Sequence, residues 1–154
     1  GGKMKSISLS LPVYYQIKNK TFLVGLNWFR NAHYQELNKV KKYYNNLIVY
    51  SLKPCKQTFY KYTINYTYFY KNSRSDALNV ISVIDKFLQD ALQDVGIIEN
   101  DNVKFYMGGS IKPSICDKEN PRLEVDIISY TNEVDCDLCE HQDIIIENKE
   151  VEND

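Results

Sequence analysis

The chain has 154 residues, of which 44% are hydrophobic and 25% charged, and its formal net charge is −1. This composition is typical of a soluble globular protein, and the length fits one domain with a core that needs no disulfide staples. No run approaches 18 apolar residues, and the start "GGKMKS" holds no apolar signal region, so we expect an intracellular protein without a membrane span. Residues 1–3 are interpreted as a tag remnant before Met4.

The charge is unevenly distributed along the chain. Residues 133–154 hold nine acidic residues and one basic residue, whereas residues 1–132 hold 18 basic and 11 acidic residues, a balance of +7. We therefore expect a basic folded domain over residues 1–132, followed by an acidic, flexible tail. A basic domain can face a polyanion, although a solvated lysine-rich surface explains the same balance.

The first half of the chain predicts two strands and a helix. "SISLSLPVYYQI" (6–17) alternates polar and apolar residues as a strand does, "KNK" (18–20) indicates a turn, and "TFLVGLNWF" (21–29) predicts a returning strand or an ordered loop. Between Asn31 and Pro54 the apolar residues recur at helical spacing. One face of this predicted helix holds Leu37, Val40, Tyr44, Leu47 and Ile48.

A tyrosine-rich strand follows. In "TFYKYTINYTYFYK" (58–71) the alternation places Tyr60, Tyr62, Ile64, Tyr66, Tyr68 and Tyr70 on one face. Such a stripe favours a core or a subunit interface over a ligand site.

The second half predicts a long helix and then short strands. "SDALNVISVIDKFLQDAL" (75–92) keeps a helical period to Val95, with Ser75 or Asp76 as the N-cap and Gly96 as the terminator. "DNVKFYMGG" (101–109) and "PRLEVDIISY" (121–130) predict strands, and "DIIIE" (143–147) indicates a short one. The order β-β-α-β-α-β-β predicts an α+β fold, a mixed sheet with two main helices.

The carboxylates around the long helix allow two interpretations. Asp76 is a cap and Asp85, Asp90 and Asp94 are solvated charges on the simpler interpretation, and Asp101 opens the next strand. A helix of about 18 residues sends the chain back toward the sheet, so its start and the start of the next strand could lie side by side. Two carboxylates brought together need a cation, and Mg²⁺ is the usual one near phosphate.

The order of these residues resembles a known family. "RSDALNVISVIDKFLQDALQDVGIIENDNVKF" (74–105) resembles the core of RusA-type Holliday junction resolvases, endodeoxyribonucleases common in phages and prophages. The family pattern has aspartates and an asparagine at the helix start, a lysine, Asp-Ala-Leu, a glycine, and an acidic pair at the next strand. The matching residues here are Asp76, Asn79, Lys86, Asp90–Leu92, Gly96 and Asp101. "VGLNWFRNAHYQELNKVKKYY" (24–44) and "NPRLEVDI" (120–127) are similar to other parts of phage members, so the resemblance covers roughly residues 6–131.

The resemblance implies a function and a set of site residues. It implies a homodimer in the bacterial cytoplasm, encoded by a phage or prophage, that nicks two opposed strands of a four-way DNA junction with Mg²⁺ or Mn²⁺ and needs no small-molecule cofactor. Asp76 and Asp101, with Asp90 as a further candidate, would hold the metal, and Lys86 would stabilise the phosphate or the leaving oxygen. The candidate DNA contacts are Arg30, Lys39, Lys42, Lys61, Lys71, Arg74, Asn79 and Lys104.

The chain departs from the family pattern at two positions. Leu78 replaces the second aspartate at the helix start, and Asn100 replaces the first member of the acidic pair. The loss of carboxylates lowers the charge available to hold Mg²⁺, unless Asp90 or Glu124 supplies a ligand. The alternative function is therefore a catalytically impaired relative that binds branched DNA or a protein partner without cleaving.

The acidic tail raises two lesser hypotheses. Cys136, Cys139 and His141 in "CDLCEH" have a spacing that suggests zinc, but neither Cys55 nor Cys116 forms the second pair that a structural site needs, and reduced thiols are expected. The tail is most simply a solubilising end. The sharper hypothesis is that it folds over the basic domain as a competitor of DNA.

Overall fold

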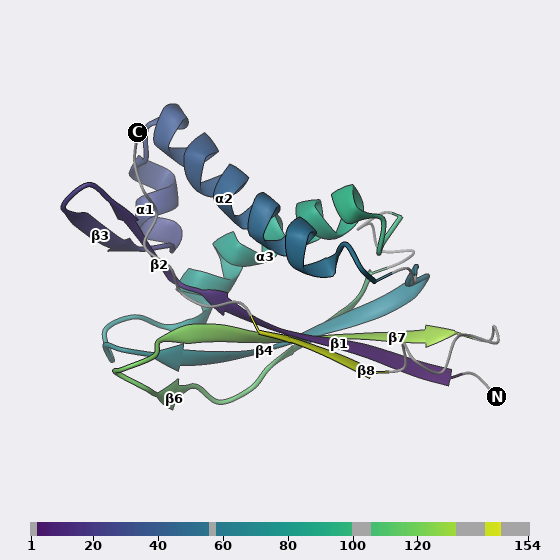
Figure 1. Cartoon of the computed structure of the whole chain (residues 1–154). Helices are drawn as coiled ribbons and strands as arrows, with labels where there is room; N and C mark the ends of the chain where they lie inside the picture. The colour runs from purple at the N-terminus through teal and green to yellow at the C-terminus, as the bar shows by residue number, and fades with distance from the viewer. Residues whose placement is uncertain (1–2, 56–57, 100–105, 132–140, 146–154) are drawn as a thin grey trace.

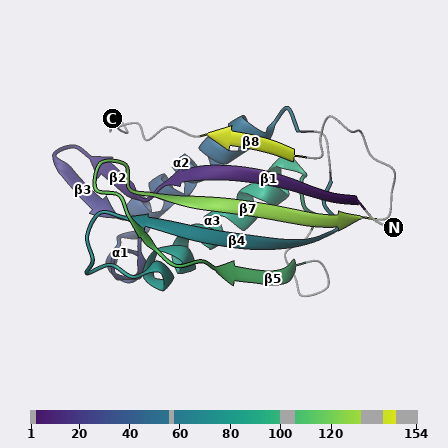
Figure 2. The same cartoon turned by 90° about the horizontal axis from the view of Figure 1, so that it is seen from below.

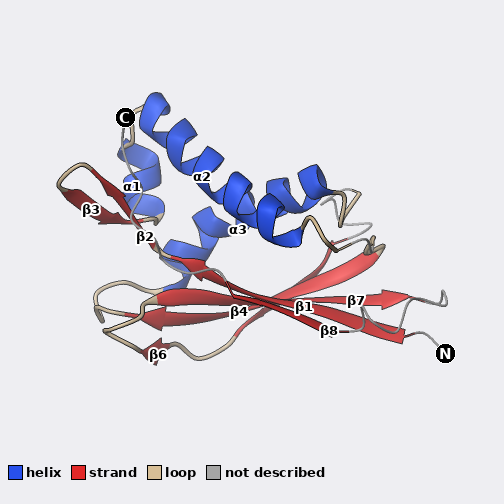
Figure 3. Cartoon of the chain, in the orientation of Figure 1, coloured by secondary structure: helices blue, strands red, loops and turns tan. Residues whose placement is uncertain are grey.

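A computed structural model describes residues 3–55, 58–99, 106–131 and 141–145. It confirms the α+β class: a mixed β-sheet carries its helices on one face (Figures 1 and 3). The described residues hold three helices, one more than predicted. In chain order the elements are β1 (Lys3–Pro12), β2 (Tyr14–Ile17), β3 (Lys20–Leu23), α1 (Leu26–Asn31), α2 (Tyr34–Leu52), β4 (Lys61–Tyr70), α3 (Ala77–Val95), β5 (Tyr106–Ile111), β6 (Ile115–Cys116), β7 (Arg122–Thr131) and β8 (His141–Ile145).

The order of the strands determines where the ends of α3 lie. The main sheet runs β5-β4-β7-β1-β8 (Figure 2). The short strand β6 also pairs with β4. β7 is antiparallel to β1 and β4, whereas β5 and β6 are parallel to β4. Because β4, α3 and β5 form a parallel crossover, α3 returns the chain to the end of the sheet where β4 begins, and Tyr106 of β5 pairs with Tyr62 there.

The core lies between the sheet and the two long helices. The predicted tyrosine face of β4 is confirmed, since Tyr62, Ile64, Tyr66 and Tyr68 are all buried, whereas Tyr60 precedes the strand and is exposed. The opposite face of the sheet carries small polar residues, such as Ser8 and Asn65, and no described helix covers it (Figure 2). The sheet therefore alternates in the way that one covered face requires.

Both predicted ends of the long helix are confirmed. Asp76 is the N-cap of α3, and its carboxylate accepts a hydrogen bond from the backbone N–H of Asn79 at 2.7 Å. Gly96 ends the helix in the left-handed region at φ 84°, which glycine adopts without a Cβ penalty. Apolar residues of α3 then pack on the sheet and on α2. The buried ones are Val80, Ile81, Val83, Ile84, Phe87, Leu88, Ala91 and Leu92.

The predicted N-terminal strand is divided into two. It breaks after Pro12, and β2 leaves the main sheet to form a hairpin with β3, with Lys18 at positive φ in the turn. Pro12 has no N–H to donate to a neighbouring strand, which favours the end of the strand there. Its carbonyl accepts a hydrogen bond from the buried Tyr44 hydroxyl. The stretch 21–29 becomes β3 and the short helix α1, so the prediction of a strand or loop there missed a helix.

The acidic segment contributes one strand to the sheet. The short strand predicted near residues 143–147 is present as β8, which pairs in parallel with Ser6–Ser10 of β1. The predicted boundary at residue 132 therefore does not separate β8 from the domain. The rest of the predicted tail lies outside the described residues. No helix in the described part of the chain combines the length and the hydropathy that crossing a membrane requires.

Candidate functional site

Asn79 joins the starts of two helices. Its Oδ1 accepts a hydrogen bond from the backbone N–H of Leu26, the first residue of α1, at 2.9 Å. A Cβ on the preceding Gly25 would lie 2.7 Å from the Asn79 Nδ2, so a larger residue at this position would displace the Asn79 side chain. The segment around Gly25 and the segment around Asn79 therefore hold the starts of α1 and α3 together. Asn79, a predicted DNA contact, has this structural role in the described part of the chain.

A basic pocket lies at this end of the molecule. It has a volume of about 570 Å³ and is lined by Tyr14, Lys71, Asn72, Ser73 and Lys118. Lys71 and Ser73 belong to the loop between β4 and α3, and Lys118 follows β6, which pairs with the last residues of β4. The Lys71 Nζ lies 5.8 Å from the centre of the Tyr14 ring, a cation–π distance. The pocket thus gathers two cations, of which the sequence predicted only Lys71.

Asp76 follows the loop that lines this pocket, three residues after Ser73. Burial raises the pKa of the Tyr68 hydroxyl, and the neighbouring Tyr14 and Asp76 raise it further, against the opposing hydrogen bond with Ser75. Asp76 also begins α3, where unpaired backbone N–H groups and the helix dipole favour negative charge. The Asp76 carboxylate already supplies the negative charge that the helix start favours, so the two lysines are the groups that make this end of the sheet favourable for a phosphate group.

The described candidates for metal ligands do not come together. Asp90 lies fourteen residues beyond Asp76 on one straight helix, about 21 Å away along its axis, and it pairs with Lys41 at 3.7 Å. Glu124 points away from the helices, because the side chains of β7 alternate and Leu123 and Val125 face the core. Within one chain neither side chain therefore lies beside Asp76, and the role of Asp90 or Glu124 as a metal ligand stays a prediction.

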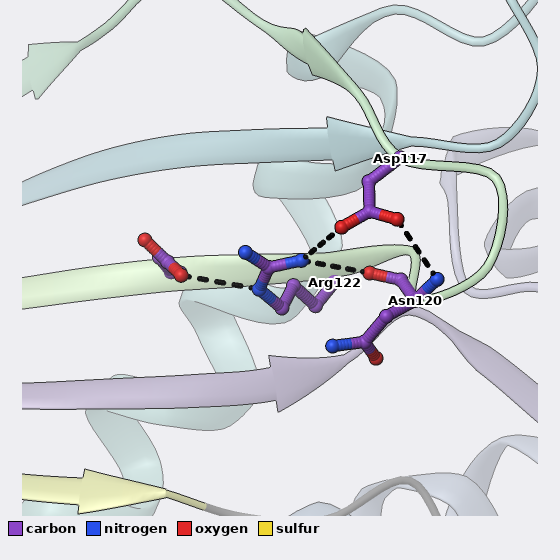
Figure 4. Close-up of polar contacts among 4 residues, drawn as sticks. Asp117, Asn120 and Arg122 are labelled. Atoms are coloured by element: carbon purple, nitrogen blue, oxygen red, sulfur yellow. Dashed lines mark hydrogen bonds and ion pairs between the residues drawn. The ribbon is translucent and has the colours of Figure 1, made fainter.

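Glu124 instead belongs to a cluster around Arg122, in which Figure 4 labels Asp117, Asn120 and Arg122. The Arg122 guanidinium donates to Glu124, to Asp117 at 2.8 Å and to the Asn120 carbonyl, and it stacks 3.8 Å from the centre of the Phe69 ring. Hydrogen bonds from Arg122 and from the Asn120 backbone lower the pKa of Asp117. This cluster holds the turn before β7.

Asn100, Asp101 and Lys104 lie outside the described residues. The described residues on either side are Ile98, which bridges to Phe59, and Tyr106, which pairs with Tyr62. Both lie where α3 ends, and the 19 residues of α3 separate that end from Asp76 by about 28 Å. The expectation that the helix start lies beside the start of the next strand is therefore wrong for β5, because a parallel crossover returns the chain to the opposite end.

The donor set that the structure describes does not fit a magnesium ion. Among the described residues there is no group of three or more His, Cys, Asp or Glu side chains positioned to hold a metal. Asp76 uses its carboxylate to cap α3, and Asp101 is the one predicted ligand whose position is not described. Asp76 and Asp90 therefore do not form the shared cation site that the resemblance implies.

The predicted cations are spread over several surfaces. Lys86 lies ten residues beyond Asp76, about 15 Å along α3, with its Nζ 4.7 Å from the centre of the Phe29 ring. Lys61 begins β4 at the far end of the sheet, about 30 Å from Lys71. Lys71 and Arg74 share the loop at the basic pocket. Arg30, Lys39 and Lys42 are exposed on α1 and α2.

A second pocket surrounds Asp85, which the sequence predicted to be a solvated charge. That prediction is wrong, because the carboxylate accepts hydrogen bonds from the Tyr66 hydroxyl and from the Gln89 side chain. The cavity, which we call the Asp85 pocket, has a volume of about 390 Å³ between α3 and the strands β4 and β5. Its walls include Ile64, Tyr66, Ile81, Ser82, Tyr106 and Ile111.

Two tyrosine pKa values reflect the Asp85 charge. Burial, followed by Asp85, raises the pKa of Tyr66 well above its ordinary value, and the same two causes raise the pKa of Tyr106 to about 12.

One signal in the sequence could have indicated that Asp85 borders the core. Residues 81 and 89, four positions away on each side of Asp85, lie on the same helical strip, and Ile81 and Gln89 are both buried.

No protein-family model matches the chain, and no curated protein matches it at a significant level.

The zinc hypothesis stays a prediction, because Cys136 and Cys139 lie outside the described residues. His33 occupies the N-cap position of α2, with its ring centre 5.4 Å from that of Tyr34. Cys55 and Cys116 are free thiols.

Proposed function

We propose that this protein binds branched DNA in the manner of RusA-type junction resolvases, with the phosphate backbone at the basic pocket, and that it nicks the DNA with the participation of Asp101. The observation that supports binding is the meeting of Lys71 and Lys118 in one pocket. Lysine side chains hold phosphates without reading bases, as a protein that recognises the shape of a junction requires.

Nicking rests on the ordered resemblance from Asp76 to Asp101, because the described carboxylates do not form a metal site. The alternative function, binding without cleavage, is favoured by a specific observation: Asp76, Asp90 and Glu124 each have a partner within the chain and lie apart. The two functions share the same surface and differ only in the chemical step. A homodimer would present two copies of that surface to the two-fold symmetry of a junction.

The first experiment measures binding to a labelled four-way junction from 50 to 200 mM salt. Each phosphate contact contributes about 0.9 to the slope of log affinity against log salt for duplex DNA, so Lys71→Gln with Lys118→Gln should lower the slope by about 2. The matched control is Lys20→Gln with Lys53→Gln, which removes the same charge at two exposed positions that are not predicted DNA contacts. If the control pair lowers the slope equally, the basic pocket is not the DNA site.

The second experiment measures nicking of the same junction with Mg²⁺ or Mn²⁺, with EDTA, and with the Asp101→Asn variant. Paired nicks that need the metal and are lost in Asp101→Asn would support the nuclease. Tight binding without nicks would leave the alternative, and Leu78→Asp would then test whether the missing carboxylate restores cleavage. The dimer is tested by light scattering, which should give twice the 18.1 kDa of one chain.

A further inference from the structure

The Asp85 pocket holds a carboxylate without a counter-charge. Among the described residues no Lys, Arg or His side chain forms an ion pair with Asp85, and the adjacent Lys86 lies against Phe29 instead. The hydrogen-bond donors that reach Asp85 are neutral, the Tyr66 hydroxyl and the Gln89 amide. A carboxylate in a partly buried cavity gains more from a cation than from further neutral donors.

The position of Asp85 is fixed by its neighbours. Gln89 donates to both carboxylate oxygens, at 3.1 Å and 3.4 Å, and its own Oε1 accepts from the Tyr62 hydroxyl at 2.8 Å. Tyr62 in turn stacks on Tyr106 with ring centres 5.2 Å apart. The carboxylate therefore does not have to reorganise when a ligand arrives, which lowers the cost of binding.

The walls of the cavity select the body of the ligand. Ile64, Ile81 and Ile111 supply apolar surface, and Tyr66 and Tyr106 supply aromatic surface. The volume, about 390 Å³, lies in the range of pockets for small molecules. The Ser82 hydroxyl, which also lines the cavity, already uses its hydrogen to donate to the Leu78 carbonyl at 2.6 Å, so it does not donate to the ligand. A divalent metal would need about six oxygen ligands, and the described lining does not offer them.

We propose that the Asp85 pocket binds an organic cation, an ammonium or guanidinium group on a compact apolar body, with the Asp85 carboxylate as its counter-ion. The apolar body lies against Ile64, Ile81 and Tyr106, and the cation completes the free lone pairs of the carboxylate. The pocket lies nine residues along α3 from Asp76, about 14 Å from the start of the helix, so this inference does not depend on DNA binding.

The test is an NMR titration of the ¹⁵N-labelled protein with benzylammonium chloride, and with benzyl alcohol as the neutral analogue of the same shape. Benzylammonium should shift the amide signals of Ser82, Asp85 and Ser110 in a saturable way, and benzyl alcohol should bind about tenfold to a hundredfold more weakly, as expected for a charge-assisted contact. Equal affinity for the two probes would overturn the proposal.

Two variants and one ion complete the test. Asp85→Asn should weaken benzylammonium binding at least tenfold, whereas Asp94→Asn, an exposed aspartate of the same helix, should leave it unchanged. Ser82→Met keeps the Asp85 charge and fills the cavity, so it should abolish binding even if Asp85→Asn does not fold. Unchanged affinity in Ser82→Met would overturn the proposal. So would MgCl₂ that produces the same shifts and displaces benzylammonium, since the pocket would then be a site for an inorganic cation.

Discussion

Replacement of Asn79 by alanine distinguishes the structural role of this residue from a role in DNA binding. The variant removes the acceptor for the Leu26 N–H, one of the first N–H groups of α1, which has no partner within its own helix. The loss of one capping hydrogen bond costs about 1 to 2 kcal/mol of the free energy of unfolding. For a chain of this length the melting temperature should fall by about 2 to 8 °C.

Urea unfolding followed by circular dichroism measures this change, alongside titration of the four-way junction. Asn79→Asp retains Oδ1 as an acceptor and should recover most of the lost stability. Asn46→Ala, at an exposed position of α2, is the matched control and should stay within about 0.5 kcal/mol of the original protein. If Asn79→Ala unfolds at the same urea concentration as the original protein but no longer binds the junction, Asn79 is a DNA contact and the reasoning from its hydrogen bond is wrong.

Two further predictions concern β5 and the turn before β7. Gly109→Ala places a Cβ 1.7 Å from the Ile64 carbonyl oxygen, so β5 must move and the free energy of unfolding should fall by more than about 2 kcal/mol. Gly108→Ala, at φ 89° with open space around it, should lower the free energy of unfolding by about 1 kcal/mol. Equal losses in the two variants would contradict the close approach of Gly109 to β4. Arg122→Leu should raise the pKa of Asp117 toward 3.8, as measured by carboxyl ¹³C NMR, and an unchanged pKa would exclude Arg122 as the cause. Because the pKa of Asp117 is lowered in the folded protein, the carboxylate stabilises the fold above about pH 4. This stabilisation is lost as the pH falls through the lowered pKa of the folded state. Arg122→Leu should remove this part of the acid sensitivity.

The long periodic elements were predicted correctly because their patterns are local. The apolar period of α3, its cap at Asp76 and its terminator at Gly96 all depend on residues within one segment, and the tyrosine alternation of β4 does too. The helix α1 was missed because its six residues are shorter than two turns and cannot show a period. Its start is instead stabilised by Asn79, which is 53 positions away and cannot be identified from the local pattern.

The Asp85 pocket was missed for a related reason. A single aspartate on a helix is usually solvated, and its burial here depends on Tyr66 of β4 and on the pairing of β5 with β4. The direction of a side chain at the edge of the buried face is decided by the neighbouring strand rather than by the helix itself. The apolar neighbours at residues 81, 84 and 88 show that Asp85 borders the core, but not that a hydroxyl meets it there.

The paired carboxylates and the basic pocket differ in how they depend on topology. A pairing of Asp76 with the start of β5 requires both to lie at one end of the sheet, and the parallel crossover places them at opposite ends. The basic pocket needs only that β4 and β6 run in the same direction, since their last residues then end side by side and release Lys71 and Lys118 together. The same crossover directs the start of α3 to this edge, the carboxyl ends of the strands, where ligands of α/β sheets commonly bind. One topological feature thus separates Asp76 from the start of β5 and brings Lys71 and Lys118 together, which is why we assign the proposed phosphate contacts to this edge of the sheet.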